Sequence, residues 1–383
     1  MLTSLITLAM RQRSAVLLGM VLLIAFGLWS ALNLPIDAVP DITNPQVQIN
    51  TAVDALAPEE IEKLVTFPIE SEMAGLPRMV ELRSLSKFGL SQVTMTFEDG
   101  IDLYLTRQLV TERLQGVLDE LPPEVAPKLA PVATGLGEIF YYSLDYLEDA
   151  PHKPATREEQ LMALAQIQEY QVKPLLRGTS GVAEVNTSGG YQKQIVIQPD
   201  PPRLAARGLS LDMLAEIVEQ NTRNAGGGYI EIGGEQLIVR ATSRVENIEQ
   251  ILAIPLKFAG AVEPVLLSEV ATVTIGSAFR TGASTDDGKE AIIGATIMLA
   301  GENSRLVAES VRDKLVEVQS KLPQGVVIRP LYDRSNLVSR TIATVEKNLT
   351  EGALLVVIVL FALLGNFRAA FIVALVIPLS MLF

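Results

Sequence analysis

The sequence contains no cysteine and a single histidine, His152. Without thiols the chain forms no disulfide bonds and no thiolate metal sites, and with one imidazole it forms no histidine cluster. His152 lies in the polar stretch Pro151–Pro154 and is predicted to be a solvated residue. No nucleophile and base stand in a pattern typical of covalent catalysis, so the sequence does not predict an enzyme.

Positive charge is scarce relative to negative charge. The 31 Lys and Arg residues are outnumbered by 44 Asp and Glu residues, which gives a formal net charge of -13. Nucleic acid binding is disfavoured because it depends on clustered basic side chains. An acidic surface suits a protein that handles cations, but most acidic proteins are simply soluble, and the charge alone leaves both open.

Aromatic side chains are sparse, and methionines are scattered. Aromatic residues make up 5% of the sequence, which disfavours an aromatic-rich cleft for organic molecules. Met73, Met95 and Met213 fall on apolar faces of predicted elements, where methionine usually fills the core. A methionine relay for soft copper or silver ions is therefore disfavoured.

Long apolar runs lie near both ends of the chain. Ala15–Leu32 is apolar apart from Ser30, and two further runs flank a short polar break near the other end. A membrane-crossing helix needs about 20 mostly apolar residues. We therefore predict a transmembrane helix in residues 1–34, a second in 336–365, and a cytoplasmic turn with the start of a third in 366–383. A cleaved signal peptide is the alternative for the first run, which is long for that role.

Arginines beside these runs indicate their orientation. Arg11 and Arg13 precede the first run, and Arg368 lies in the break between the last two. Basic residues stay preferentially on the cytoplasmic side of a membrane, so both signals place the N-terminus and the break in the cytoplasm. The long stretch between the first two runs is then expected on the opposite side.

The stretch between the runs alternates strand and helix patterns. Val93, Met95 and Phe97 alternate with polar residues, which predicts a half-buried strand. Pro58 opens a predicted helix, with a kink expected at Pro68. The apolar faces of this helix and of a second one predicted over 102–121 comprise Ile61, Val65, Ile69, Met73, Leu103, Val110, Leu114, Val117 and Leu121.

The same pattern occurs a second time. Thr156 with Glu159 forms a capping box, which predicts the start of another helix. Several later residues then repeat earlier ones at matching spacings, which indicates an internal duplication. The matches are Pro174 and Gly181 with Pro68 and Gly75, and Leu315, Val318, Leu322, Pro323 and Val326 with Leu114, Val117, Leu121, Pro122 and Val125.

The repeated unit predicts the fold class. Each copy has the pattern strand-helix-strand twice, so we predict an α+β membrane protein with transmembrane helices and two ferredoxin-like, or split βαβ, subdomains. The first is predicted at residues 35–134. The second is split into 135–188 and 275–335 by an inserted subdomain at 189–274.

The inserted subdomain is predicted to contain a helix and a long hairpin. Ser210 caps the helix, whose apolar face comprises Leu211, Leu214, Ala215 and Val218. The hairpin is either a plain surface loop or an arm that grips a neighbouring subunit, and the pattern leaves both open. Its residues are Gly226, Gly227, Gly228 and the stretch Tyr229 to Arg240, with the turn at Gly233 and Gly234.

Six short motifs, in combination, carry a family resemblance. The motifs are Pro35–Thr43, Gly89–Val93, Thr134–Ile139, Arg280–Ser284, Tyr332–Ser335 and Gly365–Ala370. With them the chain resembles, from end to end, the N-terminal part of the resistance-nodulation-division (RND) transporters. The motif residues are most similar to those of the heavy-metal efflux branch of the cobalt-zinc-cadmium type, rather than the copper-silver type.

The resemblance implies a function and a set of partners. A pump of this kind sits in the bacterial inner membrane with a large periplasmic part and exports a divalent cation, driven by the proton gradient, with no permanently bound cofactor. It implies a homotrimer joined by a periplasmic adaptor protein to an outer-membrane channel. The two repeats would be the first two porter subdomains, and the insert would be a docking subdomain with its intersubunit arm.

One departure from the family pattern concerns proton coupling. The family places the coupling carboxylates in a later membrane helix, beyond Phe383, and the apolar runs here contain no Asp or Glu. This part alone is therefore not expected to pump. A multidrug exporter of the same superfamily, or a membrane-tethered periplasmic scaffold without transport, are the alternative hypotheses.

Glu138 is the candidate metal ligand. It follows Gly135 and Gly137, whose small size is expected to allow close backbone approach, and it starts an otherwise apolar strand. A carboxylate in this position suits a hard or borderline cation, and the resemblance puts it near the porter cleft of divalent-metal pumps. The alternative is a solvated glutamate at a strand end.

Overall fold

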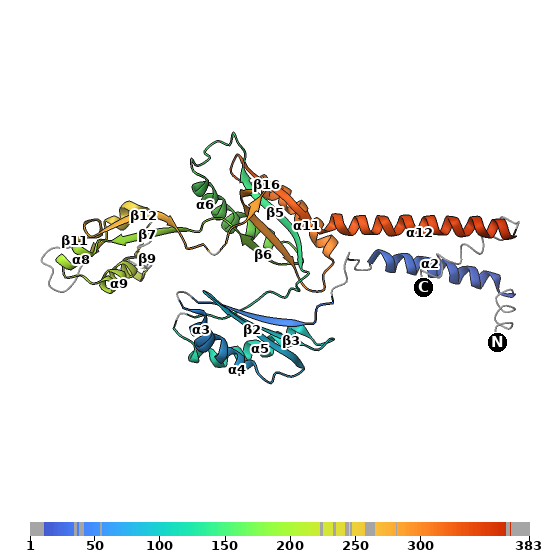
Figure 1. Cartoon of the computed structure of the whole chain (residues 1–383), viewed down its shortest axis with the longest axis horizontal. Coiled ribbons are helices and arrows are strands. Elements are labelled where there is room, and N and C mark those ends of the chain that lie inside the picture. The colour runs from blue at the N-terminus through green and yellow to red at the C-terminus, as the bar shows by residue number, and fades with distance from the viewer. Residues whose placement is uncertain are drawn as a thin grey trace. The chain divides into compact units, whose positions relative to one another are not determined.

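The computed structural model describes residues 11–33, 37, 42–53, 56–123, 125–222, 225–232, 235–241, 245, 247–256, 265–280, 282–364 and 368. Helices and antiparallel strands are both well represented, which confirms the predicted α+β class (Figure 1). The chain divides into two compact units. The first comprises Met1–Pro151, Gln168–Ser188 and Ile293–Phe383, and the second comprises His152–Ile167 and Gly189–Ile292.

The first unit contains, in its described part, a four-stranded antiparallel sheet with the order β2-β3-β1-β4. Helical segments connect β1 to β2 and β3 to β4, and they lie on one face of this sheet (Figure 1). The elements are β1 (Gln46–Ala52), α3 (Pro58–Ile61), η1 (Glu62–Thr66), α4 (Phe67–Met73), β2 (Met79–Lys87), β3 (Leu90–Phe97), α5 (Leu103–Val117), η2 (Leu118–Glu120) and β4 (Lys128–Leu129).

A second four-stranded sheet of described residues has the order β16-β5-β15-β6. If the strands of each sheet are numbered along the chain, both sheets have the order 2-3-1-4, which is the order of a split βαβ unit. The strands of this sheet, and the helical segments of the first unit that connect them, are β5 (Glu138–Tyr146), η3 (Gln168–Val172), α7 (Lys173–Arg177), β6 (Val182–Ser188), β15 (Ile292–Met298), α11 (Ser304–Gln319) and β16 (Val326–Asp333).

Burial follows the two periodicities expected for strands and helices. On β3, Val93, Met95 and Phe97 are fully buried while their neighbours along the strand are half-buried. This alternation places one face of the sheet against the helices. The predicted inward helix residues that are buried in the same cluster are Ile61, Val65, Ile69, Met73, Val110, Leu114, Val117 and Leu121.

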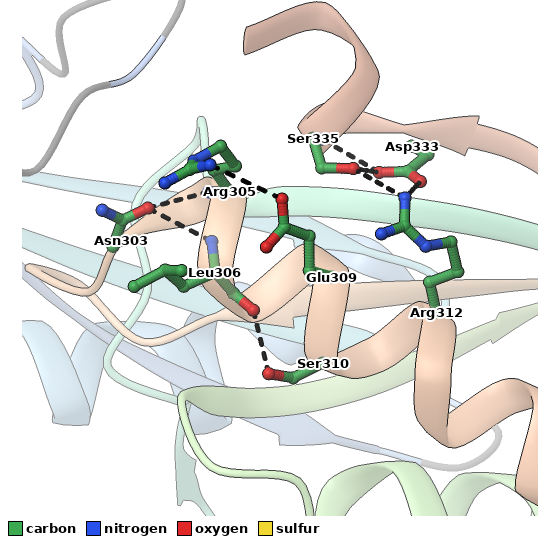
Figure 2. Close-up of polar contacts among 8 residues, drawn as sticks. All are labelled: Asn303, Arg305, Leu306, Glu309, Ser310, Arg312, Asp333 and Ser335. Carbon is green, nitrogen blue, oxygen red and sulfur yellow. Dashed lines mark hydrogen bonds and ion pairs between the residues drawn. The ribbon is translucent and has the colours of Figure 1, made fainter. Parts of the chain in front are cut away.

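A glycine with positive φ followed by a capped helix start occurs at matching places in the two copies. Gly100 and Gly301 both have positive φ, 74° and 89°, and each is followed by a capped helix. The Asp102 carboxylate accepts hydrogen bonds from the N–H groups two and three residues further on, at 2.9 and 3.2 Å. The Asn303 side chain does the same at 3.1 and 3.2 Å (Figure 2). Such caps satisfy N–H groups that have no partner inside the helix.

Each copy also accommodates a proline inside its first helical segment. Pro68 lies in the first turn of α4 and Pro174 in the first turn of α7, and each is preceded by a π-helical turn, η1 or η3. Proline has no N–H to donate and its ring crowds the preceding turn, so the wider π turn opens the helix where the regular hydrogen bond is missing. The expected kink at Pro68 thus takes the form of a π turn.

The second unit is described by itself. Its β7 and β12 form an antiparallel pair, and its apolar core includes Leu204, Leu214, Leu256 and Leu267. The elements are α6 (Arg157–Ile167), β7 (Lys193–Pro199), α8 (Pro201–Ala206), α9 (Leu211–Thr222), β8 (Ala225–Ile232), β9 (Glu235–Ala241), α10 (Ile248–Leu252), β10 (Pro255–Leu256), β11 (Val265–Leu266), η4 (Leu267–Glu269), β12 (Ala271–Ser277), β13 (Thr285–Asp286) and β14 (Lys289–Glu290).

Two helix starts in this unit match their predicted caps, and one predicted helix face is partly wrong. The capping box forms in both directions, since Thr156 N–H donates to Glu159 and Glu159 N–H donates to Thr156. Ser210 accepts a hydrogen bond at the start of α9. Leu211 and Ala215, however, are exposed, Leu211 to 60%. The stripe that packs on the core comprises the predicted Leu214 and Val218 together with Ile217.

Two further helices among the described residues are α2 (Arg13–Asn33) and α12 (Arg334–Leu364). Within the residues that the structure describes, no helix is both long enough and apolar enough to cross a membrane. The three transmembrane segments expected from the sequence are therefore not confirmed and stay predictions.

Candidate functional site

Glu138 is the first residue of β5, and its side chain is exposed. The hydroxyl of Tyr141, on the same strand, donates a hydrogen bond to Glu138 Oε2. In the described part of the chain no group of three His, Asp or Glu side chains lies close enough to hold a metal ion. A cation bound at Glu138 would therefore need ligands from water or from elsewhere to complete its shell.

Tyr141 is the partner that defines the surroundings of Glu138. Burial, the hydrogen bond to Glu138 and the nearby carboxylate charge together raise the pKa of Tyr141 to about 12. The Tyr332 ring lies beside it, with centroids 5.7 Å apart. Tyr141 therefore stays protonated at physiological pH and offers its O–H as a donor to the carboxylate.

The glycines before Glu138 differ in their surroundings. Gly137 is buried, and its N–H donates to Thr134 O at 2.9 Å while its carbonyl accepts from Met298 N–H at 2.8 Å. A Cβ added at Gly137 would lie 3.0 Å from Thr134 O, whereas one at Gly135 would meet nothing within 4 Å. The close backbone approach predicted for both glycines thus holds for Gly137 and is wrong for Gly135.

Three of the sequence motifs meet at Arg334. Its Nε donates to Asp37 Oδ1 at 3.0 Å, and its Nη1 donates to the carbonyl of Leu136 at 2.6 Å. Arg334 is 6% exposed and is the first residue of α12. One guanidinium therefore joins the segment that follows α2, the loop that leads into Glu138, and the start of α12.

The neighbouring Asp333 has a separate set of partners (Figure 2). It ends β16 and accepts from Ser335 N–H at 2.9 Å and from Ser335 Oγ at 2.6 Å, which caps α12. Arg312, from α11, pairs with its other oxygen at 3.1 Å. Asp333 thus stabilises the start of α12, and its charge is already matched.

A second polar cluster lies in the second unit, around the Arg280–Ser284 motif. Arg280 pairs with Glu290 at 3.0 Å and lies over the Tyr191 ring, with 4.1 Å from Cζ to the ring centroid. The hydrogen bond from Arg280 lowers the pKa of Glu290, and Arg157 also donates to the Glu290 carbonyl. These contacts link α6, the segment before β7, the segment after β12, and β14.

The other predicted site residues lie as follows. His152 is exposed, as expected for a solvated residue. The predicted hairpin exists as the antiparallel pair β8 and β9. Strand β8 contains Gly226, Gly227, Gly228 and Tyr229, whereas the predicted turn residues Gly233 and Gly234 lie outside the described residues. Of the arginines that indicate topology, Arg11 and Arg368 are exposed, and Arg13 is the first residue of α2.

Comparison with known proteins gives the family. A sequence profile of the AcrB/AcrD/AcrF family matches residues 5–383. The chain belongs to this family. Protein HelA of Legionella pneumophila is 48% identical over 383 residues, which cover 100% of this chain and 36% of that protein. The cobalt-zinc-cadmium resistance protein CzcA of Cupriavidus metallidurans is 46% identical over 378 residues, which cover 99% of this chain and 35% of that protein.

Solved structures agree with the sequence match. A crystal structure of a heavy metal efflux pump is 36% identical, with a TM-score of 0.87, over 99% of this chain and 37% of that chain. The resemblance to the heavy-metal efflux branch of the RND transporters is thereby confirmed. The chain spans about a third of the length of the relatives it matches.

One contact at the site was missed at the level of sequence. Asp37 and Arg334 each lie in one of the six motifs that carry the family resemblance, but they are 297 residues apart in the sequence. No periodicity links residues at such a distance. The only available signal was that each motif holds a charged residue at a predicted boundary between an apolar run and the polar body.

Proposed function

We propose that this chain is part of an inner-membrane, proton-driven efflux pump for divalent metal cations, with zinc, cobalt and cadmium as the favoured cargo. The observation that carries the proposal is the likeness, over nearly the whole chain, to a cobalt-zinc-cadmium resistance protein. Because the chain covers about a third of that relative, the activity would belong to the whole protein. The cation is cargo, and the proton gradient supplies the free energy.

The proposed topology follows from the apolar runs and their flanking arginines. Residues 1–34 and 336–365 would cross the membrane, and 366–383 would form a cytoplasmic turn and the start of a third helix, with Arg11, Arg13 and Arg368 at the cytoplasmic face. On α2 the side chains of Leu22 and Phe26 are 61% and 68% exposed, and a lipid phase would cover such apolar surface. The part between would be periplasmic.

The proposed assembly gives each sheet a place in the pump. The first sheet, in 35–134, and the second, in 135–188 and 275–335, would be porter subdomains beside the cation path. The insert at 189–274 would be the docking subdomain, with the β8–β9 hairpin gripping the next subunit of a homotrimer. A periplasmic adaptor and an outer-membrane channel would complete the system.

Glu138 is proposed as one ligand for the cation on its way through the porter region. Its carboxylate is exposed and lies at a strand end, beside a loop that Gly137 and Arg334 hold in place. The Tyr141 hydroxyl occupies one carboxylate oxygen, so the second oxygen is the one available to a metal. Borderline cations such as zinc accept carboxylate oxygen together with water.

Deletion of the gene that encodes this chain tests the proposal. We expect the inhibitory concentrations of Zn²⁺, Co²⁺ and Cd²⁺ to fall several-fold, and to return when the gene is supplied on a plasmid. Sensitivity to organic drugs and dyes should not change. Greater drug sensitivity with unchanged metal resistance would favour the multidrug alternative, and no change in either would favour a scaffold.

A further inference from the structure

The Arg334 guanidinium donates hydrogen bonds to two segments that are far apart in the sequence. Nε binds the Asp37 carboxylate at 3.0 Å, and Nη1 binds the Leu136 carbonyl at 2.6 Å. A planar guanidinium can hold two acceptors at fixed relative positions, which a lysine ammonium does less well. Arg334 therefore sets the distance between Asp37 and Leu136.

Because Arg334 is buried, its charge needs a carboxylate partner. The Arg334 side chain is 7% exposed and that of Asp37 is 28% exposed. A buried cation without its carboxylate is strongly unfavourable. Asp333, adjacent in sequence, is already bound by Arg312 and Ser335. The charge of Arg334 thus depends on Asp37, and the loss of Asp37 would weaken the hold of Arg334 on the Leu136 carbonyl.

The bond to Leu136 acts on Glu138, which lies two residues further along. Gly137, between them, is fixed through its N–H to Thr134 and through its carbonyl to Met298. With the Leu136 carbonyl held by Arg334, the backbone entering Glu138 is anchored at successive peptide groups. Among the described residues, Tyr141 is the one that binds the Glu138 side chain, and the backbone below it is held by these hydrogen bonds.

We propose that Arg334 is the positioning residue of the Glu138 site, and that it fixes the Leu136–Glu138 loop by binding Asp37 and the Leu136 carbonyl at the same time. The inference rests on the proposed function, because it takes Glu138 to be a ligand of the exported cation. It also makes the start of α12 part of the site, since a shift of this helix end moves the loop that carries the carboxylate.

Zinc titration of the purified whole protein tests the inference. Arg334→Met removes both hydrogen bonds, Arg334→Lys keeps the charge but not the fixed pair of donors, and Asp37→Asn removes the carboxylate charge. We expect the zinc dissociation constant to rise about tenfold in Arg334→Met, the low end of the effect of losing an outer-shell partner. Arg334→Lys and Asp37→Asn should show smaller rises, and they keep the test open if Arg334→Met does not fold.

A double-mutant cycle with Glu138→Gln separates positioning from general stability. If Arg334 acts through Glu138, adding Arg334→Met to Glu138→Gln should weaken zinc binding no further. Arg207→Met is the matched control, because it removes an arginine–glutamate pair, with Glu269 at 2.8 Å, that lies in the second unit and has no part in the contacts around Glu138. It should bind zinc as the wild type does.

The outcomes separate the two proposals. If Glu138→Gln weakens zinc binding while Arg334→Met, Arg334→Lys and Asp37→Asn all bind as the wild type does, Glu138 remains a ligand and the positioning role is overturned. Additive losses in the double variant would also overturn it. If Glu138→Gln itself binds zinc normally, the proposed site fails and the inference fails with it.

Discussion

Replacing Gly294 with alanine is expected to destabilise the second sheet by about 3 kcal/mol, the upper end of the usual cost of overpacking a core. Gly294 lies on β15, next to β5, and a Cβ there would lie less than 3.0 Å from Cε2, Cζ and Oη of Tyr142. Tyr142 is fully buried, so its ring cannot swing into solvent. Its hydroxyl is also held by Gln168 at 3.0 Å.

The melting temperature of the purified protein measures this effect. A loss of this size should lower the transition of the affected domain by on the order of 10 °C. Gly135→Ala is the matched control, because a Cβ there meets nothing within 4 Å, and it should melt like the wild type. Equal melting temperatures for the two variants would show that the ring does not occupy the space above Gly294.

The second large effect is expected at Glu138. Changing it to Gln keeps the shape and the hydrogen bond from Tyr141 but removes the negative charge that would bind a cation. The loss of a direct ligand should cost at least the roughly 10–100-fold in affinity that the loss of an outer-shell partner costs. Zinc titration of the whole protein measures it, and zinc resistance should fall in parallel.

Glu148→Gln controls for charge in this experiment. Glu148 lies beyond the other end of β5 and is exposed, so the variant carries the same charge change away from the proposed site. It should bind zinc and support growth as the wild type does. Wild-type zinc affinity and resistance in Glu138→Gln would mean that this carboxylate is a solvated strand end.

Much of the fold could be predicted because helix and strand periodicities are local patterns and because these patterns occur twice in the chain. Val110, Leu114 and Val117 recur at helical spacing and are buried where the period places them. The capping box at Thr156 was predictable for the same reason, since both partners lie within one turn. The helical spacing and the capping box are patterns among residues close together in the sequence, and a single sequence carries that information.

The features that could not be predicted depend on contacts between residues that are distant in the sequence. Arg334 reaches the Leu136 carbonyl because β16 pairs with β5, which brings the start of α12 beside the loop before Glu138. Asp37 binds the same guanidinium from a segment 297 residues away in the sequence. The need for glycine at position 294 arises from Tyr142 on another strand. The motif around Arg334 could be singled out, but its role could not be derived until the strand order was known.

Zinc transport into inverted membrane vesicles tests the central claim most directly. Vesicles from cells that express the whole gene encoding this chain should accumulate zinc when their interior is acidified, and a protonophore should abolish the uptake. Vesicles from the deletion strain should not accumulate zinc when their interior is acidified, and the protonophore should have no effect on them. Zinc uptake that is the same with and without the gene, or that persists when the proton gradient is collapsed, would contradict a proton-driven metal pump.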